Sequence, residues 1–510
     1  MMAFSIITDV SRSTWAAVLG TLALAASVWS YARSWYRLRH IPGPPLAPFS
    51  YLWLLRNTTL SGRQAATINA INETYGPLAR IGPNSVLTND PEVVRRMNAA
   101  RSTYVRSDWY RALSMDPYYE SLSSIRDTKA HDKMKAKLSF GYGGKENPNI
   151  ETGVDVQLQA LTKFIREKYV SASATGEGLR PMDFASKIQY FTLDAITQVA
   201  YGKAFGFLAA DADVHEYIES TTAMLPMLHA GADVPWIGNI VFSQRFTSLL
   251  GPKATDAKGY GKMIDAANRV VAERFGEKAK DKFDMLGSFV RHGVSQRACE
   301  SEVQFQIIAG SDTTATALRG TLYSLLTRPA AYATLQREID AADAAGALSS
   351  PVATAEESRK LPYLQAVIYE GLRVHIPFSG LVMKDVPPGG DTLCGFYVPG
   401  GTRVATNFLG LQRSKEMFGD DADVFRPERW LDLSPEQTTQ WRAHVELVFG
   451  NGRWGCSGKT FAFMELEKTY IQLLRNFDFQ LIDPSKPMTT SNYGIFVQEG
   501  MWLRITDRKS

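Results

Sequence analysis

The sequence has 510 residues, of which 45% are hydrophobic and 21% charged, so the chain can bury a large core without disulfides. Its formal net charge is +4 and no block of like charges occurs, which argues against the basic arm of a nucleic-acid-binding protein. Three cysteines are too few for a disulfide framework and indicate a reducing compartment.

Residues 13–32 contain no charged side chain and are long enough to cross a bilayer as one helix. Trp15 and Trp29 lie near the ends of this segment, and Arg33 and Arg37 follow it. The positive-inside rule predicts a luminal segment at residues 1–12, a transmembrane anchor at 13–32 and a cytosolic body. A cleaved signal peptide and a buried core helix are the alternatives, which the trailing positive charge and the terminal position disfavour.

Residues 33–50 are first basic and then proline-rich, which predicts a stiff hinge. From residue 51 to 510 helical patterns dominate, and no repeat or low-complexity boundary divides the segment. We therefore expect one large domain, mainly α with small β-sheets. Helices are predicted over 156–169, 260–277, 303–327, 360–372 and 459–474, and strands over 78–81, 402–405 and near both ends of 494–505.

The predicted helix 303–327 carries two charges, Asp312 and Arg319. At its centre the acid Asp312 stands beside the alcohol Thr313, whose hydroxyl can bond back to a carbonyl of the same helix. An adjacent acid and alcohol suit proton delivery, and Gly310 is expected to leave room above a flat ligand. A second membrane span and an ordinary core helix are the alternatives.

Glu370 and Arg373 lie three residues apart, which places both on one face of a predicted helix. The helix is apolar, so we expect this pair to be buried and to need further partners. Arg429, in the segment Phe-Arg-Pro-Glu-Arg-Trp at 425–430, can supply one of them. A weak pair on the surface is the alternative.

Residues 449–458 read Phe-Gly-Asn-Gly-Arg-Trp-Gly-Cys-Ser-Gly. Four glycines in ten residues indicate tight turns or a close approach of the backbone to another group. Cys456 precedes the predicted helix 459–474, and a helix N-terminus is expected to lower the pKa of its thiol and to hold it as a thiolate. A buried cysteine in a glycine-rich turn is the alternative for the loop taken alone.

The spacing Phe-x-x-Gly-x-x-x-Cys-x-Gly, together with the acid–alcohol pair, the Glu370–Arg373 pair and the segment 425–430, resembles the cytochrome P-450 superfamily from the anchor to the C-terminal hairpin. The resemblance implies the cytochrome P-450 fold and a heme b whose iron takes an axial thiolate from Cys456. Phe449 and Gly458 belong to the heme-binding signature in this comparison. Asp312 and Thr313 match the family's oxygen-activating acid and alcohol, and Glu370, Arg373 and Arg429 match its structural triad.

The same resemblance points to His131, Lys135 and Lys384 as cations for the heme propionates. The family usually has Arg or His two residues before the cysteine, whereas this chain has Trp454 there and Arg453 one residue earlier. Arg453 is a further candidate for a propionate, and the indole N–H of Trp454 can donate one hydrogen bond instead. Lysine offers a point charge rather than the fork of arginine, so a looser contact is expected.

The resemblance implies a monooxygenase that oxidises a lipophilic small molecule with dioxygen. It draws electrons from a separate membrane-bound NADPH reductase, which carries the flavins, with a b-type cytochrome as a second donor. The implied location is the endoplasmic reticulum membrane, and no nucleic acid is involved. A reductase-independent isomerase or dehydratase and a non-enzymatic heme protein are the alternatives, against which the Asp312 and Thr313 pair argues.

The motifs look closest to fungal, pisatin demethylase-like members that act in secondary metabolism. By family position, an apolar substrate pocket is expected above Thr313. Its lining is predicted from residues 104–124, 205–241, 378–381 and 495–496.

Overall fold

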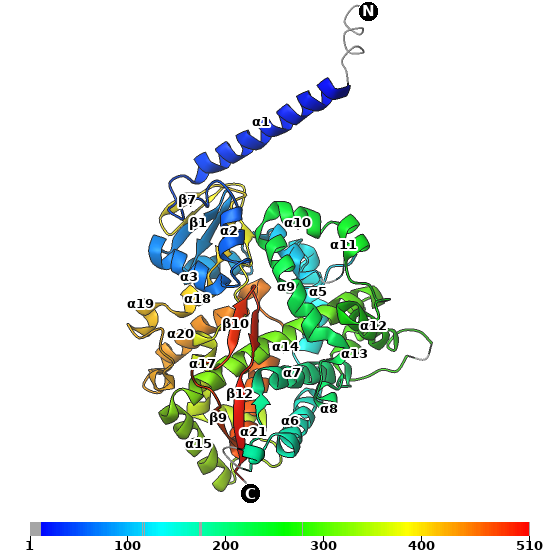
Figure 1. Cartoon of the computed structure of the whole chain (residues 1–510), viewed down its shortest axis with the longest axis vertical. Coiled ribbons are helices and arrows are strands. Elements are labelled where there is room, and N and C mark those ends of the chain that lie inside the picture. The colour runs from blue at the N-terminus through cyan, green and yellow to red at the C-terminus, as the bar shows by residue number, and fades with distance from the viewer. Residues whose placement is uncertain (1–11, 115, 117, 173–175, 278, 509–510) are drawn as a thin grey trace, which may run out of the picture.

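The computed structural model describes residues 12–114, 116, 118–172, 176–277 and 279–508, so the luminal segment predicted before residue 12 lies outside the described residues. One long helix projects from a body built of helices and small sheets (Figure 1). The body matches the predicted class, mainly α with small β-sheets.

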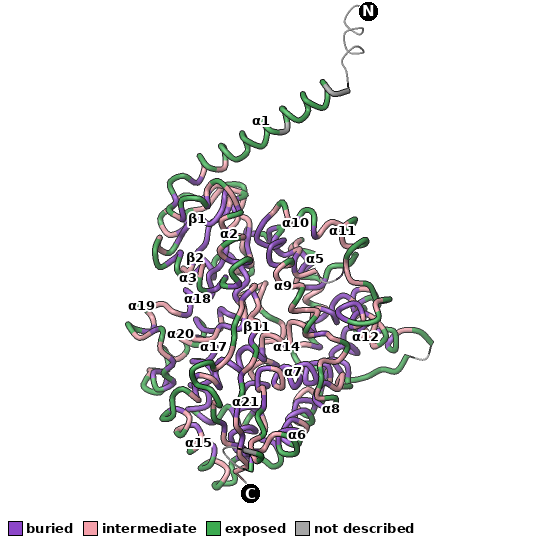
Figure 2. The backbone as a smooth tube through the Cα atoms, in the orientation of Figure 1, coloured by how far each residue is buried: buried purple, intermediate pink, exposed green. Residues whose placement is uncertain are grey.

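Helix α1 (Arg12–Leu38) extends past the predicted anchor into the predicted hinge. No proline interrupts residues 33–38, so the helix continues until the turns that precede Pro42. From Thr14 to Leu38 it is long and apolar enough to cross a membrane, with a mean hydropathy of 1.4. Its apolar window is exposed along its length (Figure 2), which contradicts the alternative of a core helix.

The sheets are small. The sheet that contains β1 lies next to α1, and β9, β10 and β12 run down the middle of the view (Figure 1). The five-stranded sheet has the order β1-β2-β8-β5-β3, with β2 and β8 parallel. The predicted strands at 78–81 and 402–405 are confirmed as β1 and β8, and the strands near 494–505 as β11 and β12. The bounds are β1 (Leu78–Gly82), β2 (Ser85–Thr88), β3 (Val105–Arg106), β4 (Met182–Asp183), β5 (Lys384–Asp385), β6 (Asp391–Leu393), β7 (Phe396–Val398), β8 (Arg403–Thr406), β9 (Phe477–Leu481), β10 (Thr489–Asn492), β11 (Phe496–Glu499) and β12 (Trp502–Asp507).

Helix α14 (Gln296–Leu326) crosses the centre of the body and packs against α7, α12, α17 and α21. It begins seven residues before the predicted start, because Ser295 caps it by accepting a hydrogen bond from Ala298 N. The prediction of a helix over 260–277 is wrong at its end, since α12 stops at Ala272 and Gly276 takes a φ of 95°.

Most of the other helices surround α14. Their bounds are α2 (Leu52–Asn57), α3 (Gln64–Tyr75), α4 (Pro91–Asn98), α5 (Thr128–Tyr142), α6 (Ile150–Lys168), α7 (Phe184–Tyr201), α8 (Phe207–Ala210), α9 (Tyr217–Asp233), α10 (Pro235–Val241), α11 (Gln244–Leu250), α12 (Gly259–Ala272), α13 (Met285–Arg291), α15 (Pro329–Ala344), α16 (Ala355–Arg359), α17 (Pro362–Val374), α18 (Phe408–Gln412), α19 (Lys415–Phe418), α20 (Pro435–Val445) and α21 (Lys459–Asn476). Short 3-10 turns include η1 (Asp108–Leu113), η3 (Val214–Glu216), η4 (Pro427–Trp430), η5 (Glu446–Phe449) and η6 (Gly452–Trp454).

The main apolar core joins α6, α7, α14, α17 and α21, and nearly every side chain of α7 is buried. Two smaller apolar clusters lie around the five-stranded sheet. Residues 449–458, called the cysteine loop from here on, meet strand β5 at the border between the helical core and this sheet. A polar site at that border is therefore held by two separately packed units.

Substituting both Leu19 and Leu22 by Arg is expected to release the chain from membranes. Both side chains are exposed on α1, and each central Arg costs about 2.5–3.5 kcal/mol of insertion free energy. Alkaline extraction of membranes measures the released fraction. Leu431→Arg, at an exposed leucine of the body, is the control and should leave extraction unchanged. Full retention of the double variant would show that α1 is not the anchor.

Candidate active site

The cysteine loop closes on itself just before α21. Cys456 N donates a hydrogen bond of 2.7 Å to Phe449 O. Gly450 and Gly452 have φ values of 74° and 56°, which favour glycine. A Cβ on Gly452 would lie 2.4 Å from Asn98 O, so the loop approaches α4 too closely for any side chain there. The loop thereby presents Cys456 three residues before Lys459, the first residue of α21, with Gly458 as the N-cap residue.

The expected lowering of the Cys456 pKa is wrong for the free thiol. Its side chain is accessible, yet surrounding chain atoms limit its hydration and raise the pKa. Backbone N–H groups of Gly458 and Lys459, together with the charges of Lys135 and Lys459, lower the pKa by less than burial raises it. A metal that binds a thiol deprotonates it directly, so a thiolate at this position would depend on a bound metal more than on the helix.

Lys384 is the centre of a buried cluster of basic side chains beside the loop. It lies on β5 opposite Arg106 of β3, and its Nζ is 3.7 Å from the centre of the Trp454 ring. The Arg106 guanidinium lies 4.3 Å from the same ring and donates to Leu122 O and Ile125 O. Burial, followed by the charges of Arg106 and Arg453, lowers the pKa of Lys384 to about 5.

Three buried donors in this cluster have no hydrogen-bond partner among the described residues: Lys384 Nζ, Arg106 Nε and Trp454 Nε1. Leaving such a donor unpaired costs about 1–3 kcal/mol, so native proteins seldom bury several together. Their common requirement is an acceptor, and an anion satisfies both the cations and the indole. The residues present therefore fit a carboxylate-bearing group such as a heme propionate.

The predicted propionate ligands separate into two sets. His131 of α5 is buried 4.3 Å from the Trp454 ring, and burial lowers its pKa to about 4. Lys135, one turn later, donates instead to Arg453 O and Gly455 O at 2.7 and 2.9 Å. Arg453 pairs with Asp132 at 3.1 Å. His131 and Lys384 thus belong to the buried cluster of basic side chains, whereas Lys135 and Arg453 fasten the loop to α5.

Sequence reasoning missed Arg106. It lies in a strand of two residues, which has no periodicity to read, and its role depends on pairing with a strand nearly three hundred residues away. The available signal was an arginine inside 104–124, a segment expected to line an apolar pocket.

Thr313 and Asp312 are neighbours on α14 but bond to different groups. Thr313 Oγ1 donates to Ala309 O at 2.8 Å, as the sequence predicted. Asp312 Oδ1 accepts from Gln189 Nε2 of α7 at 2.6 Å, and burial raises the Asp312 pKa to about 6. The expectation for Gly310 needs correction, because its missing Cβ would lie 2.7 Å from Ile196 Cγ1. Gly310 thus permits close packing of α14 on α7.

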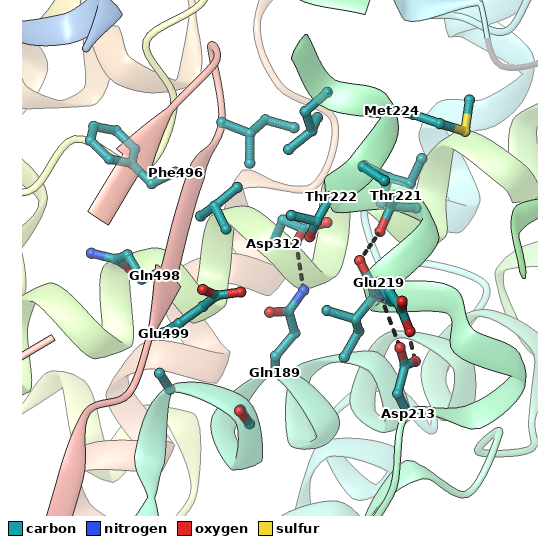
Figure 3. Close-up of a pocket in the computed structure, with 18 of the residues that line it drawn as sticks. Gln189, Asp213, Glu219, Thr221, Thr222, Met224, Asp312, Phe496, Gln498 and Glu499 are labelled. Carbon is teal, nitrogen blue, oxygen red and sulfur yellow. Dashed lines mark hydrogen bonds between the residues drawn. The ribbon is translucent and has the colours of Figure 1, made fainter. Parts of the chain in front are cut away.

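A cavity of about 430 Å³ lies beside Asp312, between α7, α9, α14 and β11 (Figure 3). Apolar side chains such as Met224, Ile308 and Phe496 form much of its wall. Of the predicted lining segments, 205–241 and 495–496 contribute, whereas 104–124 and 378–381 supply none of its described lining residues. Asp312 is among the lining residues and Thr313 is not. This cavity therefore lies on the Asp312 side of α14 and not above Thr313, where the pocket was expected.

Glu370, Arg373 and Arg429 come together as the sequence predicted. Arg373 Nε and Nη2 donate to the two oxygens of Glu370 at 2.8 and 2.7 Å, and Arg429 Nε donates to Oε1 at 3.0 Å. Trp430 Nε1 donates to the other oxygen at 2.9 Å. All four side chains are buried, so the alternative of a surface pair is excluded.

Comparison with known proteins gives a family match over residues 41–500, to the model described as Cytochrome P450. The chain belongs to the cytochrome P450 family. It is 46% identical over 506 residues to "Cytochrome P450 monooxygenase ABA1" of Pyricularia oryzae, covering 98% of this chain and 99% of that protein. It is 43% identical over 472 residues to "Cytochrome P450 monooxygenase aba1" of Botryotinia fuckeliana, covering 92% of each.

A further relative is "Cytochrome P450 monooxygenase abl1" of Leptosphaeria maculans, 38% identical over 493 residues, or 95% of this chain and 86% of that protein. This P450 is a monooxygenase, as its motifs indicated. The sequence also suggested a closer resemblance to pisatin demethylase-like members. These three relatives do not support it, because they are fungal monooxygenases with other names.

Replacing Glu370 by Gln is expected to destabilise this P450 by about 3–5 kcal/mol, because two buried guanidinium groups would lose their counter-charge. Denaturant unfolding followed by fluorescence measures the loss. Glu356→Gln is the matched control, since Glu356 pairs with Lys360 on an exposed helix face and should leave the unfolding midpoint unchanged. Equal midpoints for the two variants would contradict a structural role for Glu370.

Proposed function

We propose that Cys456 is the axial ligand of a heme b and that this P450 oxidises a lipophilic small molecule with dioxygen. The observation that carries the proposal is the position of an accessible thiol beside a buried cluster of unpaired donors. Sulfur suits the iron, and the cluster suits the negatively charged edge of the same cofactor. Family membership supports this arrangement.

Lys384, Arg106, His131 and Trp454 would hold the propionates, while Phe449 and Gly458 shape the loop around the sulfur. When bound, the heme supplies the one-electron chemistry that activates dioxygen. Lys135 keeps the loop in place by binding two of its carbonyl oxygens. Glu370, Arg373 and Arg429 hold the scaffold and take no part in the chemistry.

Asp312 and Thr313 are proposed as the proton-transfer residues. Thr313 presents a hydroxyl from the middle of α14, and Asp312 is a carboxyl whose pKa of about 6 lies near neutral pH. A group that titrates near the working pH can both give and take a proton. The heme isomerases and heme carriers considered above have no need of such a pair.

The substrate is proposed to be an uncharged lipophilic molecule, such as an intermediate of fungal secondary metabolism. Among its described lining residues the cavity has apolar and hydroxyl-bearing side chains and acids, with no Lys, Arg or His to receive an anion. Helix α1 supports a single-pass anchor in the endoplasmic reticulum membrane, where lipophilic compounds partition. Electrons would come from a separate NADPH-dependent flavoprotein reductase on that membrane, with a b-type cytochrome as a further donor.

Cys456→Ser is expected to abolish the thiolate-type Soret band of the reduced, carbon monoxide-bound protein, because a hydroxyl does not replace the thiolate donor. The difference spectrum of membranes measures the band. Cys394→Ser, at a half-buried cysteine outside the loop, should keep it. A thiolate-type band that survives in the Cys456 variant would exclude this ligand.

Lys384→Met is expected to weaken heme binding about 10- to 100-fold, the value of one or two charge-assisted hydrogen bonds. Heme titration into the heme-free protein measures the affinity. Lys163→Met, at an exposed lysine of α6, is the control.

Lys384→Met also tests, in the heme-free protein, how burial affects the protonation of Lys384. Because the folded pKa of Lys384 lies below its ordinary value of 10.5, the unfolded chain holds a proton that the folded chain lacks from about pH 5 to 10.5. The heme-free wild type should therefore gain stability as the pH rises through this window, and Lys384→Met should lose that dependence. If Lys384→Met keeps the wild-type dependence of the unfolding free energy on pH, Lys384 is not both buried and unpaired in the folded protein.

A further inference from the structure

Arg319 fixes the orientation of a side chain on the neighbouring helix. It is fully buried on α14, two turns after Asp312, and its Nε and Nη2 donate to Ala185 O of α7 at 2.9 and 2.6 Å. Nη2 also donates to Gln189 Oε1 at 2.7 Å. A guanidinium can only donate, so the amide oxygen of Gln189 must face it.

With its oxygen held by Arg319, the Gln189 amide must turn its NH2 group the other way. That group donates to Asp312 Oδ1 at 2.6 Å, and Figure 3 shows the contact reaching from α7 to α14 at the cavity wall. Arg319 thus acts on Asp312 through an oriented amide. The chain Arg319–Gln189–Asp312 begins and ends on α14 and crosses to α7 in between.

We propose that Gln189 is a positioning residue for proton transfer, which holds the Asp312 carboxyl at the wall of the cavity while Arg319 fixes the direction of the amide. The inference rests on the proposed function, because it gives Gln189 a role only where Asp312 moves protons. Among the described residues, no hydrogen bond joins Gln189 to the cysteine loop or to Thr313.

The charges around Asp312 explain why the amide matters. Arg319 is the neighbouring cation. Tyr217 of α9 is a buried phenol whose pKa is raised by burial and by the charge of Asp312. Tyr190 of α7 and Tyr260 of α12 also line the cavity, and its acids are Asp213, Glu219 of α9 and Glu499 of β11. Burial raises the pKa of Asp312, and Arg319 and the Gln189 N–H lower it. Without that N–H the pKa of Asp312 would rise further, so a larger share of the carboxyl would be protonated at neutral pH and unable to take up a proton.

Gln189→Glu separates positioning from packing. Glutamate has the same length and still accepts from Arg319, but it has no N–H for Asp312 and places a second carboxyl against it. Gln198→Glu is the matched control on the same helix, because Gln198 accepts a hydrogen bond from Ala204 N and lies against Gly153 of α6. Gln189→Leu serves as a second variant that removes both hydrogen bonds.

The first measurement is the pKa of Asp312 in the heme-containing protein, from the infrared carboxyl band that disappears in Asp312→Asn. We expect titration near pH 6 in the wild type and in Gln198→Glu. In Gln189→Glu the pKa should rise by about one unit or more, a tenfold change in the ionisation constant. If Gln189→Glu loses the thiolate-type Soret band, Gln189→Leu decides, with the same upward shift expected. An unshifted pKa in the folded variant overturns the proposal.

The second measurement is the solvent deuterium isotope effect on NADPH consumption with a reductase and no added substrate. It should increase in Gln189→Glu and stay at the wild-type value in Gln198→Glu; an unchanged effect in both variants also overturns the proposal. These outcomes are separate from a failure of the proposed function, which would show as a wild type without a thiolate-type band.

Discussion

The Glu370 carboxylate joins helix α17 to the turn η4 and to the segment before it. It accepts from Arg373 and Arg429, from the Trp430 indole and from Arg426 N. Arg373 also donates to Gln412 O, Ala422 O and Val424 O. These bonds tie α17 to the long connection that leads to the cysteine loop, and they leave both charges of the central pair with partners. A buried ion pair adds little to stability against an apolar pair of equal size, but it fixes geometry because no other arrangement satisfies every donor.

Three buried ionisable groups in this P450 differ in how far the chain supplies their hydrogen-bond partners. The Glu370 network has its donors within the chain. The Lys384 cluster lacks acceptors among the described residues, and burial lowers the pKa of that lysine accordingly. Asp312 is intermediate, since the charge of Arg319 and the hydrogen bonds from Gln189 and Ser311 offset burial only in part and leave its pKa near 6. Glu370, with its donors in place, is structural. Lys384, without an acceptor, indicates an external anion, and Asp312, with its pKa near neutral pH, can exchange protons.

The sequence predicted the features that depend on local spacing. Helix α17 presents Glu370 and Arg373 on one face because they are three residues apart, and Thr313 bonds back within its own turn. Features that depend on distant pairing were missed or assigned wrongly. Arg106 meets Lys384 only through sheet register, and Lys135 contacts the loop rather than the cluster. The raised pKa of Cys456 likewise reflects how densely the folded chain surrounds it, which the approaching helix N-terminus does not reveal.

Helix α14 is clamped on two sides, and this determines where the cavity can change shape. A Cβ at Gly310 would strike Ile196 of α7, and a Cβ at Gly320 would lie 2.5 Å from His375 Cγ, whose ring also bonds Ser324. Rotation of α14 would break both close contacts, so Thr313 and Asp312 keep their directions. The opposite wall is less constrained. Helix α9 begins after two consecutive residues with positive φ, His215 at 62° and Glu216 at 57°, and it contains Pro226. Backbone in that region carries strain that a small rearrangement relieves, so we expect the cavity to adjust to ligands by movement of α9 against a fixed α14.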